Sequence, residues 1–395
     1  MLDLNILYDD NMPFAADVFP SLGQAQAFNH QTISANDLCN VNALMLRSTT
    51  KINAQRVEQL TQCQYLATAT AGYNHLDLDA LASADIATYV AAGCNAESVA
   101  EYALAGILHT LLARGDILLS DSFEVLSGFT VGIVGLGQVG RRVLTKFSAL
   151  GMTVHAYDPP RAEAEAQPQW GDLTAILQCD IVCLHAPLVK TGAHPTLHLF
   201  NEEVLTQLSP RQILLNAGRG EVIDNQALLR SAEQQLAPTL ILDVWEHEPT
   251  ILKSLIAHCL FATPHIAGHS LEGKTRGTFM LYEWLAQQVN QPVVHKMHEF
   301  LPDATLQIVC SDECLTIESL SILVGTVYDI AYDHSQFVTN MSQSDCFALL
   351  RKQYRDPKYQ LDASIRREFD TLQITCTHQP TQLILSALGF NAIAP

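Results

Sequence analysis

The chain has 395 residues, too many for one ordinary hydrophobic core, and this length predicts two or three domains. Its 48% hydrophobic and 16% charged content is typical of a globular protein. The formal net charge of −19 argues against nucleic acid or an anionic membrane as the main partner. An anionic small molecule would therefore need a local cationic site.

The ten cysteines form no C-x-x-C pair, and no apolar stretch or signal pattern indicates a membrane anchor or export. These features predict reduced thiols in a cytoplasmic protein. We expect no structural metal and no membrane partner.

The first part of the chain alternates short apolar runs with helical stretches. The runs are NILYD, ALMLRS, YLATATA and IATYVAA, which end near residues 9, 48, 71 and 92. Such alternation predicts β-α-β units and a parallel sheet, whose functional loops follow the carboxyl ends of the strands. Ser98 and Glu101 fit a capping box before a long apolar helix.

A glycine-rich turn, GIVGLGQVG, lies in the middle of the chain. Its Gly135, Gly137 and Gly140 fit G-x-G-x-x-G, between a predicted strand at 130–134 and a predicted helix at 139–150. A second strand is predicted at 153–157, directly before Asp158. This strand-turn-helix-strand-acid order is typical of dinucleotide binding, whereas isolated glycine pairs also mark ordinary turns.

The spacing has a physical reason. A pyrophosphate can rest on the N–H groups around Gln138 and Val139 only if no Cβ intervenes, and the helix dipole favours its charge. Asp158 would accept the ribose hydroxyls and repel a 2′-phosphate, so we expect NAD rather than NADP.

Four later apolar runs predict the other strands of a second doubly wound sheet. They are DIVCLHAPL, ILLNAGRG, TLILDVWEHEP and CLFATPHIAG. Asn201 and Asp224 are expected N-caps of the helices between them. The order of segments predicts a cofactor domain inserted into another domain, and clefts between domains are common ligand sites.

The last hundred residues show no catalytic motif. Helices are predicted at 319–332, 345–354 and 380–388, with a strand at 371–376. Two segments, LRKQYRDPKYQ and SIRREF, concentrate positive charge. We favour a solvated basic face of an association domain over direct substrate contact.

Three residues at predicted strand ends could carry chemistry. His265 is a base or acid suited to neutral pH, Glu248 could orient its ring, and Arg219 could hold a carboxylate and a nascent carbonyl. Each taken alone could serve packing, helix capping or a solvated turn. Their joint occurrence after a dinucleotide motif indicates oxidation of a 2-hydroxy acid to a 2-oxo acid.

The motifs GLGQVG, NAGRG, LDVWEHEP and PHIAG resemble those of the D-isomer-specific 2-hydroxyacid dehydrogenases over about residues 1–285. Further segments, among them LMLRSTTK, AAGCNAESVAEY, YDPPRA and HIAGHSLEGKTRGT, resemble the erythronate-4-phosphate dehydrogenases of that family over nearly the whole chain. This resemblance implies a Rossmann NAD-binding domain (98–265) inserted in a flavodoxin-like substrate domain (1–97 and 266–290). It also implies a C-terminal α+β dimerisation domain (291–395) and hence a homodimer.

The resemblance also implies roles for single residues. Arg219, Glu248 and His265 correspond to the active-site arginine, acid and proton carrier of the family. Residues that correspond to NAD contacts are Gly135, Gly137, Gln138, Val139, Gly140, Asp158, Ala186, Asp243 and Gly268. Residues that correspond to substrate contacts are Arg47, Ser48, Thr70 and His269. Arg47 to Lys51 also gather hydrogen-bond donors after a strand, which could hold a phosphate or merely cap the next helix.

The chain departs from the family pattern in three places. Ala186 stands where the family usually has a threonine, and His269 stands where it has a substrate-contacting tyrosine. The segment near 355–364 is longer than usual.

The resemblance implies NAD-dependent oxidation of 4-phospho-D-erythronate to (R)-3-hydroxy-2-oxo-4-phosphobutanoate, a step in the synthesis of pyridoxal 5′-phosphate (vitamin B6). Two alternatives stay open on the residues. One is another D-2-hydroxyacid dehydrogenase, such as a 3-phosphoglycerate dehydrogenase, and the other is a non-catalytic NAD-sensing protein.

Overall fold

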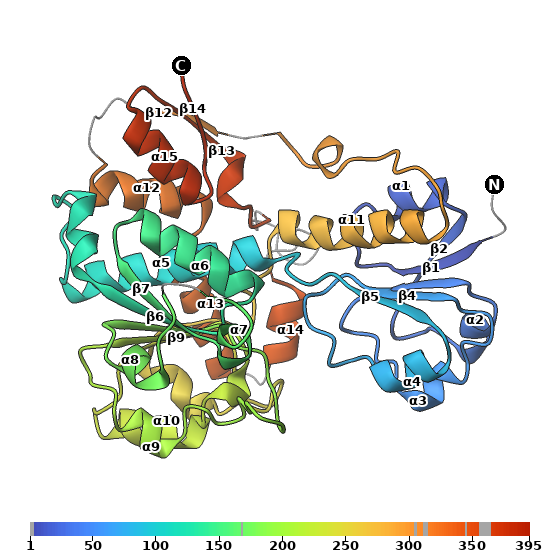
Figure 1. Cartoon of the computed structure of the whole chain (residues 1–395), viewed down its shortest axis with the longest axis horizontal. Helices are drawn as coiled ribbons and strands as arrows, with labels where there is room; N and C mark the ends of the chain where they lie inside the picture. Colours follow the sequence, from blue (N-terminus) through green and yellow to red (C-terminus); the bar gives the residue numbers. More distant parts are fainter. Residues whose placement is uncertain (1–3, 167–168, 304–305, 311–314, 344–345, 355–364) are drawn as a thin grey trace. The chain divides into compact units, whose positions relative to one another are not determined.

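The computed structural model describes residues 4–166, 169–303, 306–310, 315–343, 346–354 and 365–395. The chain forms two compact units (Figure 1). The first comprises Met1–Asn95 and Ser270–Asp303, and the second comprises Ala96–His269 and Ala304–Pro395. Among the described residues, no helix combines the length and the apolar character needed to cross a membrane.

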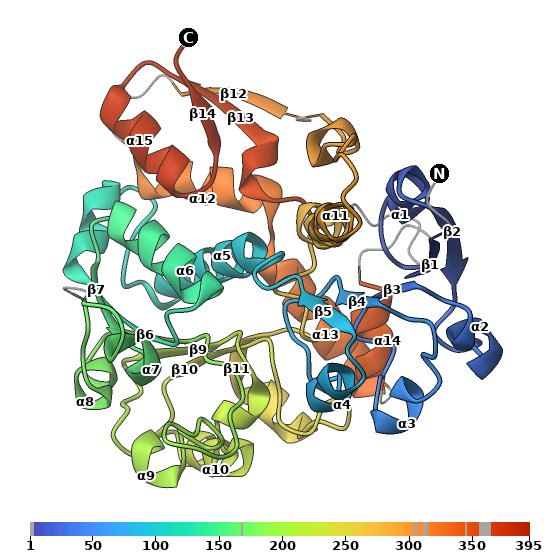
Figure 2. The same cartoon turned by 45° about the vertical axis from the view of Figure 1, so that its right-hand side comes forward.

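The first unit is a five-stranded parallel sheet covered by helices on both faces. Its strands are β1 (Asn5–Asp9), β2 (Gln24–Phe28), β3 (Ala43–Leu46), β4 (Tyr65–Thr68) and β5 (Ala87–Val90). Its helices are α1 (Ala15–Val18), α2 (Ala35–Cys39), α3 (Ala54–Val57), α4 (Leu78–Ser83) and α11 (Leu271–Gln288). The spatial order β2-β1-β3-β4-β5 is the flavodoxin-like order, so this part of the predicted fold is confirmed. Figures 1 and 2 show α11 on one face of the sheet and α3 and α4 on the other.

The second unit contains a six-stranded parallel sheet. Its strands are β6 (Thr130–Val134), β7 (Thr153–Tyr157), β8 (Ile181–Leu184), β9 (Ile213–Asn216), β10 (Thr239–Leu242) and β11 (Cys259–Ala262). Its helices before the C-terminal region are α5 (Ala96–Arg114), α6 (Gln138–Ala149), α7 (Pro159–Ala162), α8 (Leu173–Leu177), α9 (Glu202–Leu205) and α10 (Asn225–Glu233). The order β11-β10-β9-β8-β6-β7 reverses at β6, and such a switch point is where doubly wound sheets bind ligands.

The C-terminal region adds a small third sheet with its own helices. Its elements are β12 (Leu306–Cys310), α12 (Ile317–Val327), α13 (Ile330–Gln343), α14 (Phe347–Lys352), β13 (Leu372–Cys376), α15 (Gln379–Ala387) and β14 (Asn391–Ile393). The strands pair in the order β12-β13-β14, all parallel. The predicted fold class, two doubly wound sheets and a smaller C-terminal α+β part, is therefore confirmed.

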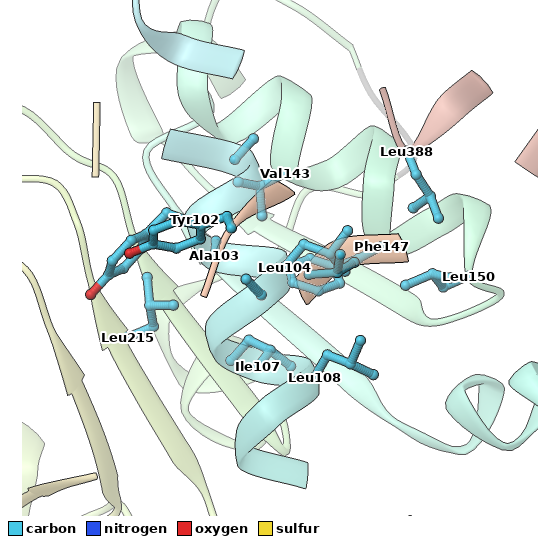
Figure 3. Packing of buried hydrophobic residues seen from close by; sticks show 14 of the residues in the cluster. Tyr102, Ala103, Leu104, Ile107, Leu108, Val143, Phe147, Leu150, Leu215 and Leu388 are labelled. Carbon is cyan, nitrogen blue, oxygen red and sulfur yellow. The ribbon is translucent and has the colours of Figure 1, made fainter. Parts of the chain in front are cut away.

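The C-terminal region shares a hydrophobic core with the six-stranded unit. Helix α5 packs along α6, and side chains of α5 such as Leu104 and Leu108 lie among Val143, Phe147 and Leu388 (Figure 3). Because Leu388 follows α15, removing the C-terminal region would expose part of this core to water.

Three local predictions are wrong. Helix α5 begins at Ala96, so Ser98 and Glu101 are inside it and form no capping box. The Ser98 hydroxyl donates instead to Glu368 Oε1 (2.7 Å), and Glu101 Oε1 accepts from Phe369 N (2.7 Å). The single helix predicted at 319–332 is two helices, which are separated at Tyr328 by extended backbone.

The third wrong prediction is the solvated position of Arg366 within the predicted basic face, whereas Lys352 of that face is exposed. Arg366 is 1% exposed and donates to the carbonyl oxygens of Ala267 (2.8 Å) and Ser98 (2.7 Å). The positive charge near the C-terminus is therefore partly interior. The long segment at 355–364 lies outside the described residues.

Candidate active site

The three glycines of the turn between β6 and α6 have separate steric reasons. Gly135 has φ +90°, and a Cβ there would lie 2.7 Å from Ala186 N. A Cβ on Gly140 would collide with Gly135 O, so this glycine allows the helix to pack on the turn. A Cβ on Gly137 would meet no protein atom within 4 Å. The space above Gly137 is therefore left open, as a bound group that approaches the backbone requires.

Helix α6 begins directly at this open space. Gly137 is its N-cap and makes no side-chain cap, and Gln138 at the first helical position is exposed. Val139 follows it in the first turn. The N–H groups and the dipole of a twelve-residue helix thus face a cradle that fits a pyrophosphate.

Asp158 follows β7, as predicted, but its carboxylate also supports the glycine turn. Oδ2 accepts from Leu136 N (2.8 Å), and Oδ1 caps α7 by accepting from Arg161 N (3.3 Å). The nearby Arg141 and Arg161 both pair with Glu165, at 2.7 and 2.9 Å. Since Glu165 offsets these cations, the end of β7 is poorly suited to a 2′-phosphate.

The loop after β8 carries His185 and Ala186. The imidazole of His185 is buried, and neither ring nitrogen has a hydrogen-bond partner in the described part of the chain. Burial lowers the pKa of His185 to about 3, so the ring is neutral. Ala186 is buried beside Gly135 and brings no hydroxyl to the turn.

Asp243, at the end of β10, holds the loop that carries His265. Its Oδ1 accepts from Ile266 N (2.7 Å) and its Oδ2 from Ala267 N (3.0 Å). The same Oδ1 accepts from the Thr263 hydroxyl (2.7 Å). Burial raises the pKa of Asp243, against the charge of His265 and these hydrogen bonds. Gly268, farther along the loop, is partly buried.

His265 and Glu248 form a hydrogen-bonded pair. Nδ1 of His265 lies 2.6 Å from Oε2 of Glu248, and Oε1 of Glu248 accepts from Trp245 N (3.0 Å). Burial pulls the pKa of Glu248 up, but the hydrogen bond and charge of His265 and the charge of Arg351 hold it below its usual value. An ionised Glu248 fixes the ring so that Nε2 is the nitrogen available for proton transfer.

Arg219 lies between two glycines after β9. Its Nη1 donates to Gly218 O (2.8 Å), and a Cβ on Gly220 would collide with the carbonyl of Trp245. This close approach brings the arginine loop to the loop of Glu248. Burial lowers the pKa of Arg219, the charge of Glu248 opposes this, and the charge of Arg351 adds to it. The structure thus brings Arg219, Glu248 and His265 together.

The predicted substrate residues of the first unit lie at the carboxyl ends of two neighbouring strands. Leu46 of β3 pairs with Thr68 of β4, so Ser48 and Thr70 follow at equivalent positions. Ser48 is exposed and Arg47 is partly buried. The Thr70 hydroxyl donates to Gly72 O (2.9 Å) and lies 2.8 Å from the Thr68 hydroxyl, so its proton is already engaged.

His269 is the last residue of the segment Ala96–His269 of the second unit, and its side chain contacts the C-terminal region. Its ring lies edge-on to that of Tyr354, with centroids 6.1 Å apart. The structure therefore places an aromatic residue of the C-terminal region against the position at which the chain departs from the family pattern.

Sequence reasoning missed the residues that reach this site from the C-terminal region. Arg351 lies 3.9 Å from Oε2 of Glu248, and Arg366 donates to the carbonyl of Ala267 in the His265 loop. The only available signal was the positive charge of their segments. Among the described residues, no group of three or more His, Cys, Asp or Glu is arranged to hold a metal ion.

Comparison with known proteins defines the class. Residues 111–267 match the family model of the D-isomer specific 2-hydroxyacid dehydrogenase NAD binding domain, and residues 300–389 match a domain of unknown function. A D-lactate dehydrogenase from Aquifex aeolicus, solved with NAD and lactic acid, superimposes with a TM-score of 0.58 at 22% identity. That match covers 72% of this chain and 96% of the other. The fold and the matched NAD-binding domain are those of the NAD-dependent 2-hydroxyacid dehydrogenases.

Closer relatives narrow the family. An erythronate-4-phosphate dehydrogenase from Pseudoalteromonas atlantica is 41% identical over 98% of this chain and 100% of its own length. An erythronate-4-phosphate dehydrogenase from Psychromonas ingrahamii is 37% identical over 98% of this chain and 97% of its own length. The chain belongs to the erythronate-4-phosphate dehydrogenase family.

Proposed function

We propose that the chain oxidises the C2 hydroxyl of 4-phospho-D-erythronate with NAD, giving (R)-3-hydroxy-2-oxo-4-phosphobutanoate and NADH. The observation that carries this proposal is the hydrogen bond between His265 and Glu248 beside Arg219, on an NAD-binding domain. Relatives that match nearly the whole chain and bear the name of this enzyme support the choice of substrate.

The cofactor would be held by residues that fit it. The open space at Gly137 and the first turn of α6 would hold the pyrophosphate, and Asp158 would accept the ribose hydroxyls. The buried, neutral His185 offers unpaired ring nitrogens beside Ala186. When bound, NAD supplies the hydride acceptor. We expect Asp243 to act mainly by holding the loop of His265. Gly268, in the same loop, remains a proposed NAD contact.

The protein's part of the reaction is proton transfer and charge stabilisation. Nε2 of His265 takes the proton of the C2 hydroxyl as the hydrogen on C2 leaves as a hydride, with the electron pair of the C2–H bond. Glu248 stabilises the imidazolium through Nδ1. Arg219 binds the carboxylate and the oxygen that becomes the carbonyl. The proton leaves His265 to solvent after product release.

The phosphate end of the substrate needs donors or cations in this acidic chain. Arg47 and Ser48 follow β3, and the exposed Ser48 hydroxyl is suited to donate. Because the Thr70 hydroxyl already donates to Gly72 O, we propose that Thr70 contacts substrate through its backbone N–H. His269 would replace the phenol of the usual tyrosine by an imidazole, which donates at a shorter reach.

We also propose a cytoplasmic homodimer that acts in pyridoxal 5′-phosphate synthesis. Val309 of β12, Ile322 of α12 and Leu383 of α15 are 75%, 58% and 64% exposed, and self-association through this region would bury such apolar surface. Sedimentation that shows only monomer at micromolar concentration would contradict the dimer. Growth without added vitamin B6 after gene deletion would contradict the pathway.

Replacing the proposed base tests the catalytic assignment. His265→Ala should lower kcat for 4-phospho-D-erythronate by at least about a hundredfold, because general base catalysis contributes about 10²–10⁴ in rate. The dissociation constant of NADH, followed by its fluorescence, should change by less than about threefold, since the pyrophosphate cradle is untouched. Turnover near that of the unaltered protein would refute the role of His265.

A further inference from the structure

A helix of the C-terminal region places an arginine at the proposed catalytic pair. Arg351 is in the last turn of α14, and its Nη1 lies 3.9 Å from Oε2 of Glu248. The same oxygen lies 2.6 Å from Nδ1 of His265. One carboxylate oxygen therefore faces both the ring and a guanidinium.

The position of α14 is fixed by buried aromatic packing. The ring of Phe347, in the first turn of α14, packs on Phe337 of α13 with centroids 6.1 Å apart. Phe337 packs in turn on Trp245, at 5.8 Å. The backbone N–H of Trp245 donates to the other oxygen of Glu248. The helix with Arg351 and the loop with Glu248 thus share one hydrophobic cluster, which holds the charge in place.

The charges around His265 come from four segments. Glu248 is its hydrogen-bond partner, and the charges of His265 and Asp243 interact. Arg219 follows β9, and Arg351 lies on α14. The charge of Arg351 lowers the pKa of both Glu248 and Arg219. Its side chain is 35% exposed. A cation beside a carboxylate favours the charged form of that carboxylate. Arg351 therefore helps to keep Glu248 ionised, the form that holds Nδ1 of His265.

We infer that Arg351 is a positioning residue for proton transfer: it keeps Glu248 ionised, and that carboxylate holds the ring of His265 with Nε2 free to accept the proton of the substrate hydroxyl. The inference rests on the proposed function. It gives the C-terminal region, matched by a domain of unknown function, a part in the reaction itself. Oxidation should gain from Arg351 at low pH, where Glu248 would otherwise take up a proton.

The pH profile of kcat/KM for oxidation tests this role with three variants of the full chain. Arg351→Gln removes the charge, Arg351→Lys keeps a charge on a different head group, and Lys352→Gln removes the neighbouring, exposed charge of the same helix. In Arg351→Gln the acid limb should move to higher pH by about 0.5 to 1 unit, as expected for one charge several ångströms away in a partly solvated site. The acid limbs of Arg351→Lys and Lys352→Gln should lie within about 0.3 unit of the unaltered protein's.

A lower plateau with an unshifted acid limb would reduce Arg351 to a structural role and overturn the inference. A raised KM for phosphorylated substrates alone, with an unshifted limb, would overturn it in favour of phosphate binding. Failure of the proposed function has a different signature, because the unaltered protein would then turn over no 2-hydroxy acid. Circular dichroism and NADH affinity identify a variant that has not folded. If Arg351→Gln has not folded, Arg351→Met takes its place: the same upward shift of the acid limb is expected, and an unshifted limb overturns the inference.

Discussion

Arg366 offers a direct test of whether the C-terminal region supports the catalytic loop. Its guanidinium is buried, lies 3.9 Å from the centroid of the Tyr328 ring, and donates short hydrogen bonds to Ala267 O and Ser98 O. Burial disfavours its charge, but Tyr328, Tyr354 and Glu101 raise the pKa of Arg366 above its usual value. The interior therefore holds a permanent cation whose Nη1 and Nη2 donate to backbone carbonyls, while Nε has no hydrogen-bond partner among the described residues.

The cost of removing this cation can be worked from its contacts. A hydrogen bond to a charged group contributes about 1.5–3 kcal/mol, and Arg366→Met loses two short ones in the interior. Methionine recovers part of the packing on Tyr328. We expect the free energy of unfolding to fall by about 3–5 kcal/mol.

The effect on catalysis follows from the place of Ala267, two residues after His265. Asp243 accepts from N–H groups of the loop, and Arg366 donates to a carbonyl of the same loop. Loss of the Arg366 contact should lower kcat/KM about tenfold or more under conditions in which the variant is folded.

Urea denaturation and steady-state kinetics measure both quantities. The matched control is Arg230→Met, which removes an exposed arginine of the same unit that pairs with Glu202 at 3.2 Å. It should change the free energy of unfolding by less than about 1 kcal/mol. A loss below about 1 kcal/mol in Arg366→Met, with unchanged kcat/KM, would refute the argument from burial and hydrogen bonding.

Two further predictions concern the cofactor site. The free energy of unfolding of Gly137→Ala should lie within about 0.5 kcal/mol of that of the unaltered protein. Its affinity for NAD, measured by calorimetry, should fall at least about tenfold, because the added Cβ fills only the cradle. In Gly140→Ala the added Cβ collides with Gly135 O, so the free energy of unfolding should fall by at least about 2 kcal/mol. Equal effects of the two changes on stability would contradict this assignment. His185 stays neutral in the folded state down to about pH 3, whereas an unfolded histidine takes up a proton below about pH 6.5, so stability is lost as pH falls. His185→Leu should therefore lose less stability between pH 7.5 and pH 5 in urea titrations, by about 2 kcal/mol, and an unchanged acid sensitivity would show that His185 is not the group responsible.

Local sequence patterns predicted the elements in which neighbouring residues decide the structure. The strands at 130–134 and 153–157 have the predicted bounds, and α6 ends before Gly151 with φ +80°. Asn201 and Asp224 cap α9 and α10 as expected. In each case the deciding groups lie within a few residues of one another.

The wrong or missing predictions concern residues whose structure depends on partners far away in the sequence. Ser98 and Glu101 have capping-box spacing, yet their partners Glu368 and Phe369 are far along the chain. Strand β2, with the sequence QAQAF, lacks the large apolar side chains of its neighbour β1, because it is an edge strand of its sheet. Arg366 looks like a surface residue in a basic segment, and only the tertiary fold provides its buried carbonyl partners.

The residues of the candidate site also fall into those that local sequence patterns could predict and those that they could not. Arg219, Glu248 and His265 could be predicted because they follow parallel strands whose carboxyl ends share one edge. Arg351 could not, since it depends on the packing of Phe347 on Phe337.

The measurement that tests the central claim most directly is kcat/KM of the purified protein with NAD for three substrates: 4-phospho-D-erythronate, 3-phospho-D-glycerate and D-lactate. The hydride chemistry is the same for all three, so the ratios report recognition of the rest of the substrate. We predict a preference for 4-phospho-D-erythronate of at least about a hundredfold over either competitor. A preference for 3-phospho-D-glycerate or D-lactate would contradict the substrate assignment, and NADH binding without turnover of any of them would indicate an NAD sensor.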